Sequence, residues 1–159
     1  MARPWSVPEF DPDESPRASA AKILRTKLLE MCSYEKPVLG GNETEAIHDM
    51  RVSARRFQAA LKLFQGFFQK KKFRTRSREL KELVDLLGEV RHYDVLLASL
   101  PPFTGEVSQV EGEAVRLLTA RLSHDRGKAF LKLRKEIRHR KREHYEEAWL
   151  KFLTRSLEL

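Results

Sequence analysis

The stretch TEAIHDMRVSARRFQAALKLFQGFF, residues 44–68, decides the fold because its spacing places two parallel rows of side chains on one helix. The first row is apolar and advances by alternating steps of three and four residues, which keeps it on one side of an α-helix. The second row follows the same steps on the neighbouring face and is mostly cationic. Fourteen residues rise about 21 Å along a helix, so charges that repel one another are held in a line, which favours a partner with repeated negative charge. The apolar row is Ile47, Met50, Ala54, Phe57, Leu61, Phe64 and Phe68, and the second row is His48, Arg51, Arg55, Gln58 and Lys62.

The charge of the chain is unevenly distributed. The 159 residues carry a net charge of +8, with 41% hydrophobic and 34% charged residues, which suits one folded, helix-rich domain. Residues 43–76 hold nine basic and three acidic residues (+6), residues 77–114 hold three and eight (−5), and residues 115–142 hold eleven and two (+9). Surfaces that only need solubility usually intersperse both signs, so this segregation predicts an anionic ligand.

The pattern of apolar residues predicts an all-α protein. Residues 1–17 hold four of the seven prolines and four acidic residues, which predicts an extended acidic arm ahead of a helical bundle over residues 18–159. We expect helices over residues 19–32, 44–68 and 77–100, with the basic run 69–76 as a connection. Residues 107–157 are too long for one ordinary helix, so a break is expected near 123–127 or near 139–143. Because no segment alternates with period 2, the expected fold class is all-α, a four-helix-type bundle of antiparallel helices.

Several functional classes leave patterns that this sequence lacks. No stretch approaches the roughly 20 apolar residues that cross a bilayer, and residues 1–16 hold no apolar signal core, so we expect a cytoplasmic protein without a membrane partner. Cys32 is the single cysteine, which suits a reducing compartment. His48 and the other four histidines do not follow a metal-ligand spacing, so no metal is expected. There is no Gly-rich phosphate loop or nucleophile elbow, and neither an enzyme nor a cofactor is predicted.

A second basic row follows residues 121–142. Its members advance by steps of three and four residues, and an apolar row that includes Leu122, Leu133 and Ile137 runs beside it. A charged helix face is usually only solvated surface, but acidic residues then alternate with the basic ones, and across residues 115–142 only Asp125 and Glu136 do so. We therefore favour anion binding, while single members of the row remain plain surface residues in the alternative interpretation. The row is Arg121, His124, Lys128, Lys132, Lys135, His139 and Arg142.

Individual cations have distinct expected roles. Arg51 and Arg55 lie four residues apart, so their planar guanidinium groups can bind successive anionic groups along the helix. Arg56 points about 100° away from Arg55, where an acidic residue of a neighbouring helix is the alternative partner. Arg91 and Asp94 can meet because they lie three residues apart, and a structural ion pair between them is the alternative to ligand contact.

Two segments resemble the signatures of a known family, the CHAD domain, whose name stands for conserved histidine α-helical domain. Residues 45–57, EAIHDMRVSARRF, resemble the family's H-x-x-R-V-x-x-R-R helix. Residues 86–96, LLGEVRHYDVL, resemble its L-G-x-x-R-D-x-D-V segment, with His92 where the family usually has Asp. Gln58 also replaces a commonly basic residue. The two motifs stand in the family's order and spacing, and a looser likeness extends over about residues 19–155.

The resemblance implies an all-helical module that binds inorganic polyphosphate through basic side chains lining a central cavity. His48, Arg51, Arg55 and Arg56 match the first signature, and Arg91 matches the basic position of the second. Full-length members resemble two four-helix halves related by a pseudo-twofold axis, whereas this chain has the length of about one half and looks like a short single-half member. A homodimer with twofold symmetry is the expected way to restore the second half.

The leading hypothesis is non-catalytic binding of linear inorganic polyphosphate, in the cytoplasm or at polyphosphate granules. The alternative is a helical nucleic-acid-binding module, which carries the same electrostatic signal but usually adds exposed aromatic side chains for stacking. A polyphosphate hydrolase or kinase is a third alternative, for which Asp85, Glu89 and Asp94 are the candidate acidic residues. The predicted polyphosphate-binding residues are His48, Arg51, Arg55, Arg56, Lys62, Arg91, Arg121, Lys128, Lys132, Lys135, Lys22 and Arg25.

Overall fold

The computed structural model describes residues 3–8, 11, 13–40, 43–100 and 109–157, and these ranges contain helices but no strand. The prediction of an all-α protein is confirmed. None of the described helices is both long enough and apolar enough to cross a lipid bilayer. The elements are α1 (Pro16–Ser33), α2 (Glu35–Gly40), α3 (Glu43–Leu63), the 3-10 turn η1 (Gln65–Phe67), α4 (Lys70–Ser99), α5 (Gln109–Arg142) and α6 (Tyr145–Leu157).

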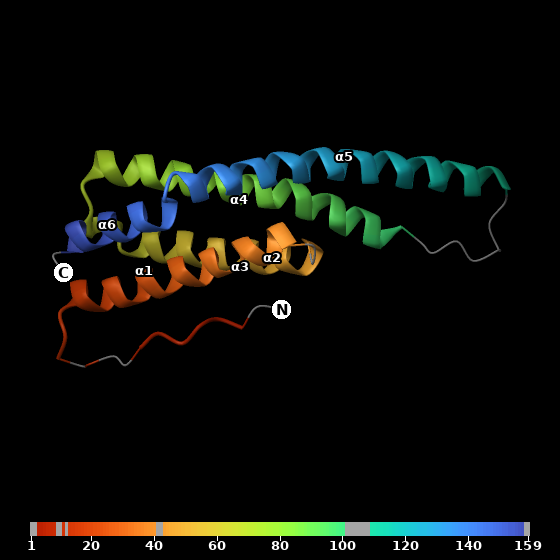
Figure 1. Cartoon of the computed structure of the whole chain (residues 1–159). Helices are drawn as coiled ribbons and strands as arrows, with labels where there is room; N and C mark the ends of the chain where they lie inside the picture. The colour runs from red at the N-terminus through yellow and green to blue at the C-terminus, as the bar shows by residue number, and fades with distance from the viewer. Residues whose placement is uncertain (1–2, 9–10, 12, 41–42, 101–108, 158–159) are drawn as a thin grey trace.

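The helices pack as an antiparallel bundle in which α3 lies against both α1 and α4 (Figure 1). α6 packs on α1, and α5 returns along α4 in the opposite direction (Figure 1). At one end, the C-terminal part of α4 and the N-terminal part of α5 continue past the other helices as a two-helix extension (Figure 1). The predicted bundle of antiparallel helices is therefore confirmed, and the extension is an addition to it.

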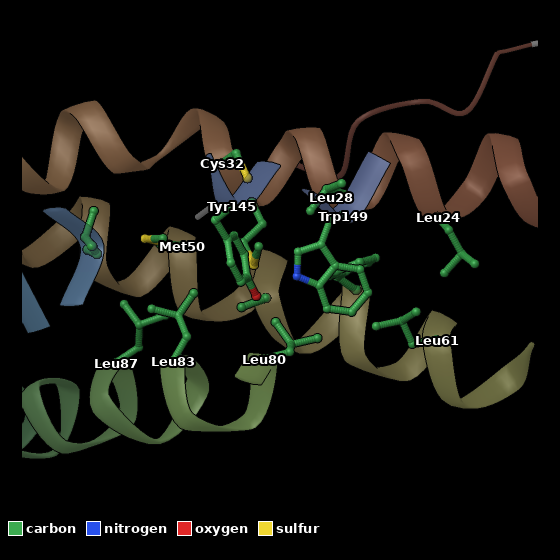
Figure 2. Packing of buried hydrophobic residues seen from close by; sticks show 14 of the residues in the cluster. Leu24, Leu28, Cys32, Met50, Leu61, Leu80, Leu83, Leu87, Tyr145 and Trp149 are labelled. Carbon is green, nitrogen blue, oxygen red and sulfur yellow. The ribbon is translucent and has the colours of Figure 1, made fainter. Parts of the chain in front are cut away.

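The predicted apolar row of α3 lies at the centre of the core. Trp149 of α6 is fully buried and reaches between Leu28 and Leu80 from two other helices (Figure 2). Its indole packs edge to face on Phe57 of α3, with 5.0 Å between the ring centroids. The steps of three and four residues thus identify the face of α3 that is removed from water. The members of the row with at most 2% of their surface exposed are Ile47, Met50, Ala54, Phe57 and Leu61.

The junction between α3 and α4 differs from the sequence prediction. α3 ends at Leu63 rather than at residue 68, and α4 begins at Lys70 rather than at residue 77. Phe68 is extended and buried, and its ring stacks on Phe73 with 5.7 Å between centroids. The prediction of a connection over residues 69–76 is therefore wrong. The basic run forms the first turns of α4 because Phe73, in its middle, packs against the core.

The long C-terminal helical sequence breaks once, between α5 and α6. α5 runs unbroken through residues 123–127, so the break lies near the second of the two predicted positions. His144 has a φ of 51°, the left-handed conformation that commonly ends helices, and its N–H donates to the carbonyl of Lys141 at 3.3 Å. The turn carries α6 away from α4 and onto α1, where Trp149 enters the core.

The described part of the acidic arm is attached to α1. α1 begins at Pro16 rather than at residue 19, because the Ser15 side chain caps it by accepting a 3.2 Å hydrogen bond from the Ala18 N–H. Lys22 and Ser19 donate hydrogen bonds to Glu14, and these bonds lower the pKa of that carboxyl. The arm therefore neutralises one of the cations that α1 presents.

Candidate functional site

The seam between α3 and α4 brings the two sequence motifs together. Arg51 of α3 lies across α4 at Gly88, where a methyl group on the glycine would come within 3.8 Å of Arg51 Nε. Arg91 lies three residues further along α4, close to one helical turn, and both arginines are half-buried. The glycine of the second motif thus leaves room for the arginine of the first. We call the surface formed by His48, Arg51, Arg55 and Arg91 the α3–α4 seam.

The cations of the seam are not neutralised within the described part of the chain. No described carboxylate lies within ion-pair distance of Arg51, Arg55 or Arg91. His48 is half-buried, and its Nδ1 is enclosed without a hydrogen-bond partner among the described residues. A buried N–H without an acceptor is costly, so the neutral ring favours its proton on Nε2. The seam therefore offers two half-buried guanidinium groups and an exposed one, none of which has a counter-charge among the described residues.

Arg56 occupies a different surface from the seam. Its Nη1 lies 3.1 Å from Oε1 of Glu30, a fully buried carboxylate that also accepts a 2.9 Å bond from Lys27. The alternative noted for Arg56, an acidic partner on a neighbouring helix, is what the structure contains. Lys22 and Arg25 lie on α1, on this same side of α3, and Lys22 bonds to Glu14 at 2.5 Å. The structure does not bring these three cations to the α3–α4 seam.

The second basic row lies along the exposed side of α5. Arg121 pairs with Asp125 at 2.9 Å, and Lys132 lies 3.4 Å from Glu89 of α4. Both cations are largely exposed, so water screens these pairs and they contribute little to stability. Lys128 is exposed and has no ion pair with a described residue. The row is thus available to a ligand but is not held in place by packing.

Lys135 borders two shallow surface pockets, and many of the basic side chains of α5 line them. One pocket, of about 370 Å³, is lined on a single helix by Leu131 and by further arginines. The other, of about 520 Å³, lies between α4 and α5. Sequence reasoning missed Arg134 and Arg138 in the first pocket, although the density of cations over residues 134–142 was a usable signal. The basic side chains that line the two pockets are Lys132, Arg134, Lys135, Arg138, His139 and Arg142.

The two rows flank α4 on different sides. Gly88 faces Arg51 of α3, whereas the next residue, Glu89, pairs with Lys132 of α5. Neighbouring residues of a helix diverge by about 100°, so α4 separates the rows. The structure gives two cationic surfaces rather than one groove. Lys62 lies exposed at the C-terminal end of α3, beyond the contact with Gly88.

Asp94 does not pair with Arg91. Its Oδ1 accepts a 2.7 Å bond from Nε of Arg126, which reaches across from α5, and the Asp94 side chain is only 4% exposed. The alternative of a structural ion pair between Arg91 and Asp94 is therefore not found, because a tertiary contact with Arg126 takes the carboxylate. This exchange leaves Arg91 without the intrahelical counter-charge that its spacing had suggested.

The comparison with protein families decides the assignment that these motifs suggest. The family model for the CHAD domain matches residues 22–158, nearly the whole chain. The chain belongs to the CHAD domain family. This family is linked with polyphosphate binding. No curated protein and no solved structure matches the chain.

The acidic residues considered for catalysis and the single cysteine have defined surroundings in the structure. The described residues include no group of three or more His, Cys, Asp or Glu side chains arranged to hold a metal ion. The acidic residues considered for a hydrolase or kinase are each bonded to a different cation, Asp85 to Lys81 at 2.5 Å and the other two as described above. Cys32 is buried, and burial raises the pKa of its thiol well above the usual range. In the structure the three carboxylates form ion pairs, and Cys32 packs in the core.

Proposed function

We propose that this CHAD domain binds linear inorganic polyphosphate without converting it. The observation that carries the proposal is the pair of half-buried arginines, Arg51 and Arg91, that flank Gly88 without a carboxylate partner in the described chain. Guanidinium groups bind phosphoryl oxygens in a planar, two-pronged geometry. Arg55 and Lys62 would extend the contact along α3, and the α5 row would bind a second segment of chain.

The proposal is for binding alone because the nearby acidic residues have other partners. Asp85, Glu89 and Asp94 are engaged by Lys81, Lys132 and Arg126 respectively. A phosphoryl-transfer site would need carboxylates that converge on magnesium ions. Incubation with long-chain polyphosphate and magnesium should release no phosphate, and release above the rate in buffer would overturn the non-catalytic proposal.

Competition with nucleic acid separates the leading proposal from its alternative. Phe57, on the helix that carries the seam, and Trp149, which packs on it, are fully buried and cannot stack on bases. We expect fluorescent long-chain polyphosphate to be displaced by unlabelled polyphosphate far more readily than by RNA or DNA at equal phosphate concentration. Easier displacement by nucleic acid would reverse this ranking.

A charge-matched pair of variants tests where polyphosphate binds. Arg51→Gln with Arg55→Gln removes two charges from the seam, and we expect at least a tenfold loss of affinity in moderate salt. Lys36→Gln with Arg116→Gln removes two exposed charges elsewhere and should change affinity about twofold or less. Equal losses in the two variants would mean that net charge, rather than the seam, governs binding.

We also propose that two copies associate. The two-helix extension of α4 and α5 exposes large apolar side chains, among them Val95, Val110 and Leu117, which are at least 50% exposed. A second copy packed there would remove this apolar surface from water and supply the other half expected from the resemblance. Light scattering should give the mass of a dimer, and a monomer both with and without polyphosphate would contradict the association. In the cell, binding of this kind would bring the protein to cytoplasmic polyphosphate granules.

A further inference from the structure

A third cationic surface lies at the end of the bundle opposite the two-helix extension. There the N-terminal turns of α1 and α4 lie near the C-terminal turns of α6 (Figure 1). Side chains of these helices line an open pocket of about 870 Å³. Pockets of roughly 300–1,000 Å³ are typical of small-molecule sites. None of the pocket's cations belongs to the seam or to the α5 row. They are Arg17, Lys71, Lys72, Arg76, Lys151 and Arg155.

Two of these cations are held in place by the fold. Arg17 donates a 3.1 Å hydrogen bond from Nη1 to the carbonyl of Ser156, and its guanidinium lies 5.3 Å from the centroid of the Phe67 ring. Arg76 bonds to Glu79, the acidic residue of the lining, at 2.8 Å. Packing therefore fixes the orientation of both arginines at the pocket before any ligand arrives, which lowers the entropy lost on binding.

The remaining cations leave the pocket strongly positive. Lys71, Lys72, Lys151 and Arg155 are exposed, and none forms an ion pair with a described residue. Six basic side chains thus converge on a lining with one acidic residue. The first turn of α4 contains no acidic residue, so the partial positive charge of that helix end adds to the field. At the C-terminal end of α6, Arg17 already compensates the carbonyl of Ser156.

The pocket also has apolar walls, which distinguish it from the basic rows. Phe67 of η1 and Phe152 of α6 contribute to its lining. Inorganic polyphosphate has no group that would gain from contact with these rings. Glu79, the lining residue nearest along α4 to Gly88, lies nine residues from it, which corresponds to about 14 Å. Distance and chemistry therefore both separate the pocket from the seam.

We propose that this pocket binds a compact organic phosphate of the nucleoside triphosphate class. The cluster of cations suits several phosphoryl groups joined in a short unit, whereas a row suits a long chain. The planar base of such a ligand would lie against the partly exposed Phe67 ring and the Arg17 guanidinium. Free tripolyphosphate offers the same charges without the base, so it serves as the direct comparison.

Calorimetric titration of the full chain with magnesium-free ATP at about 0.15 M salt tests the proposal. We expect saturable binding that weakens at least tenfold in Lys72→Gln with Lys151→Gln. Lys36→Gln with Arg116→Gln loses the same charge from exposed positions outside the pocket and should bind within about twofold of the wild type. Absence of ATP binding, or an equal loss of ATP affinity in the two double variants, would overturn the proposal that the pocket binds a nucleoside triphosphate.

The apolar part of the ligand is tested separately. ATP should bind at least fivefold more tightly than tripolyphosphate, and Phe67→Ala should remove this preference while tripolyphosphate affinity is retained. Equal binding of the two ligands to the wild type would contradict the role given to the rings. Arg51→Gln with Arg55→Gln should keep ATP binding, so a failure of the pocket and a failure of the polyphosphate proposal give different results.

Discussion

The basic rows of α3 and α5 have the same spacing in the sequence but differ in how the fold holds them. Arg51 of α3 is half-buried against Gly88 and has no counter-charge among the described residues. Arg121 and Lys132 of α5 are 74% and 64% exposed and have weak carboxylate partners. A cation that packing has already positioned loses less conformational entropy when it binds an anion. The spacing of cations thus locates a charged face, whereas burial predicts which of its members should have the greatest effect on affinity for an anion.

Charge reversal should give the largest difference between the two rows in their effect on polyphosphate affinity. Arg51→Glu places an anion in the half-buried seam, and we expect about a 100-fold loss of polyphosphate affinity, or roughly 2.7 kcal/mol. Lys128→Glu changes the net charge by the same amount, but in a solvated row, and should lower polyphosphate affinity only about threefold. Fluorescence anisotropy with labelled polyphosphate measures both constants. Losses of the same size would show that the rows are equivalent.

A buried and an exposed ion pair allow the effect of burial to be compared for the free energy of unfolding. Glu30→Gln removes the fully buried carboxylate that serves both Lys27 and Arg56. Because Arg56 is 31% exposed and can regain water, we expect a loss of about 2 kcal/mol rather than the 3–5 typical of fully buried pairs. Asp85→Asn breaks the exposed pair with Lys81 and should change the free energy of unfolding by less than about 0.5 kcal/mol. Urea unfolding followed by circular dichroism measures both, and similar midpoint shifts would contradict the distinction.

Within α5 itself, one arginine belongs to the core rather than to the ligand surface. Arg140 is 5% exposed, bonds to Glu136 at 2.6 Å and to the Glu79 carbonyl at 2.7 Å, and lies 4.5 Å from the centroid of the Tyr145 ring. Burial raises the pKa of Tyr145 to about 12, although the neighbouring Arg140 charge opposes the shift. The folded state therefore keeps the phenolic proton at a pH where the unfolded chain has lost it.

This shift predicts a specific loss of stability at high pH. The contribution of Tyr145 is complete below pH 10 and declines as the pH rises towards 12, by about 2 kcal/mol. Tyr145→Phe removes this dependence while the other alkaline groups titrate as before. The variant should match the wild type near pH 7, since the hydroxyl has no partner among the described residues, and exceed it at pH 11 to 12. If the free energies of unfolding of the variant and the wild type changed in parallel with pH over this range, the prediction would be refuted.

Local periodicity made much of α3 and its surface predictable. Steps of three and four residues identified the row from Ile47 to Leu61 that forms the centre of the core. The 100° rotation between neighbouring residues suggested an acidic partner for Arg56 only as an alternative, while Arg56 stayed among the predicted binding residues, and the structure pairs it with Glu30. For the break in residues 107–157 the sequence left two candidate positions. The segment is too long for one ordinary helix, but its length does not determine where the helix is interrupted. His144 decides the position through its backbone conformation.

Contacts between distant segments could not be predicted from spacing. Asp94 bonds to Arg126, 32 residues away, and this contact outcompetes the local partner Arg91. The dense charges of residues 70–76 suggested a connection and concealed Phe73, whose packing makes the run helical. The pocket at the end of the bundle was missed for the same reason, since its cations come from three helices and share no motif.

Gly88 offers the smallest test of the comparison, because it joins the two motifs without carrying charge. A glycine inside a helix costs about 0.5–1 kcal/mol relative to alanine. The added methyl group of Gly88→Ala would lie 3.8 Å from Arg51 Nε, an ordinary van der Waals contact. We therefore expect thermal unfolding to show a gain of about 0.5–1 kcal/mol in stability, with polyphosphate affinity unchanged within about twofold. Gly88→Leu extends further towards Arg51 and should weaken binding, while Gly127→Leu, in open surroundings on α5, should not. If both leucine variants bind as tightly as the wild type, the position of Arg51 across α4 does not govern affinity.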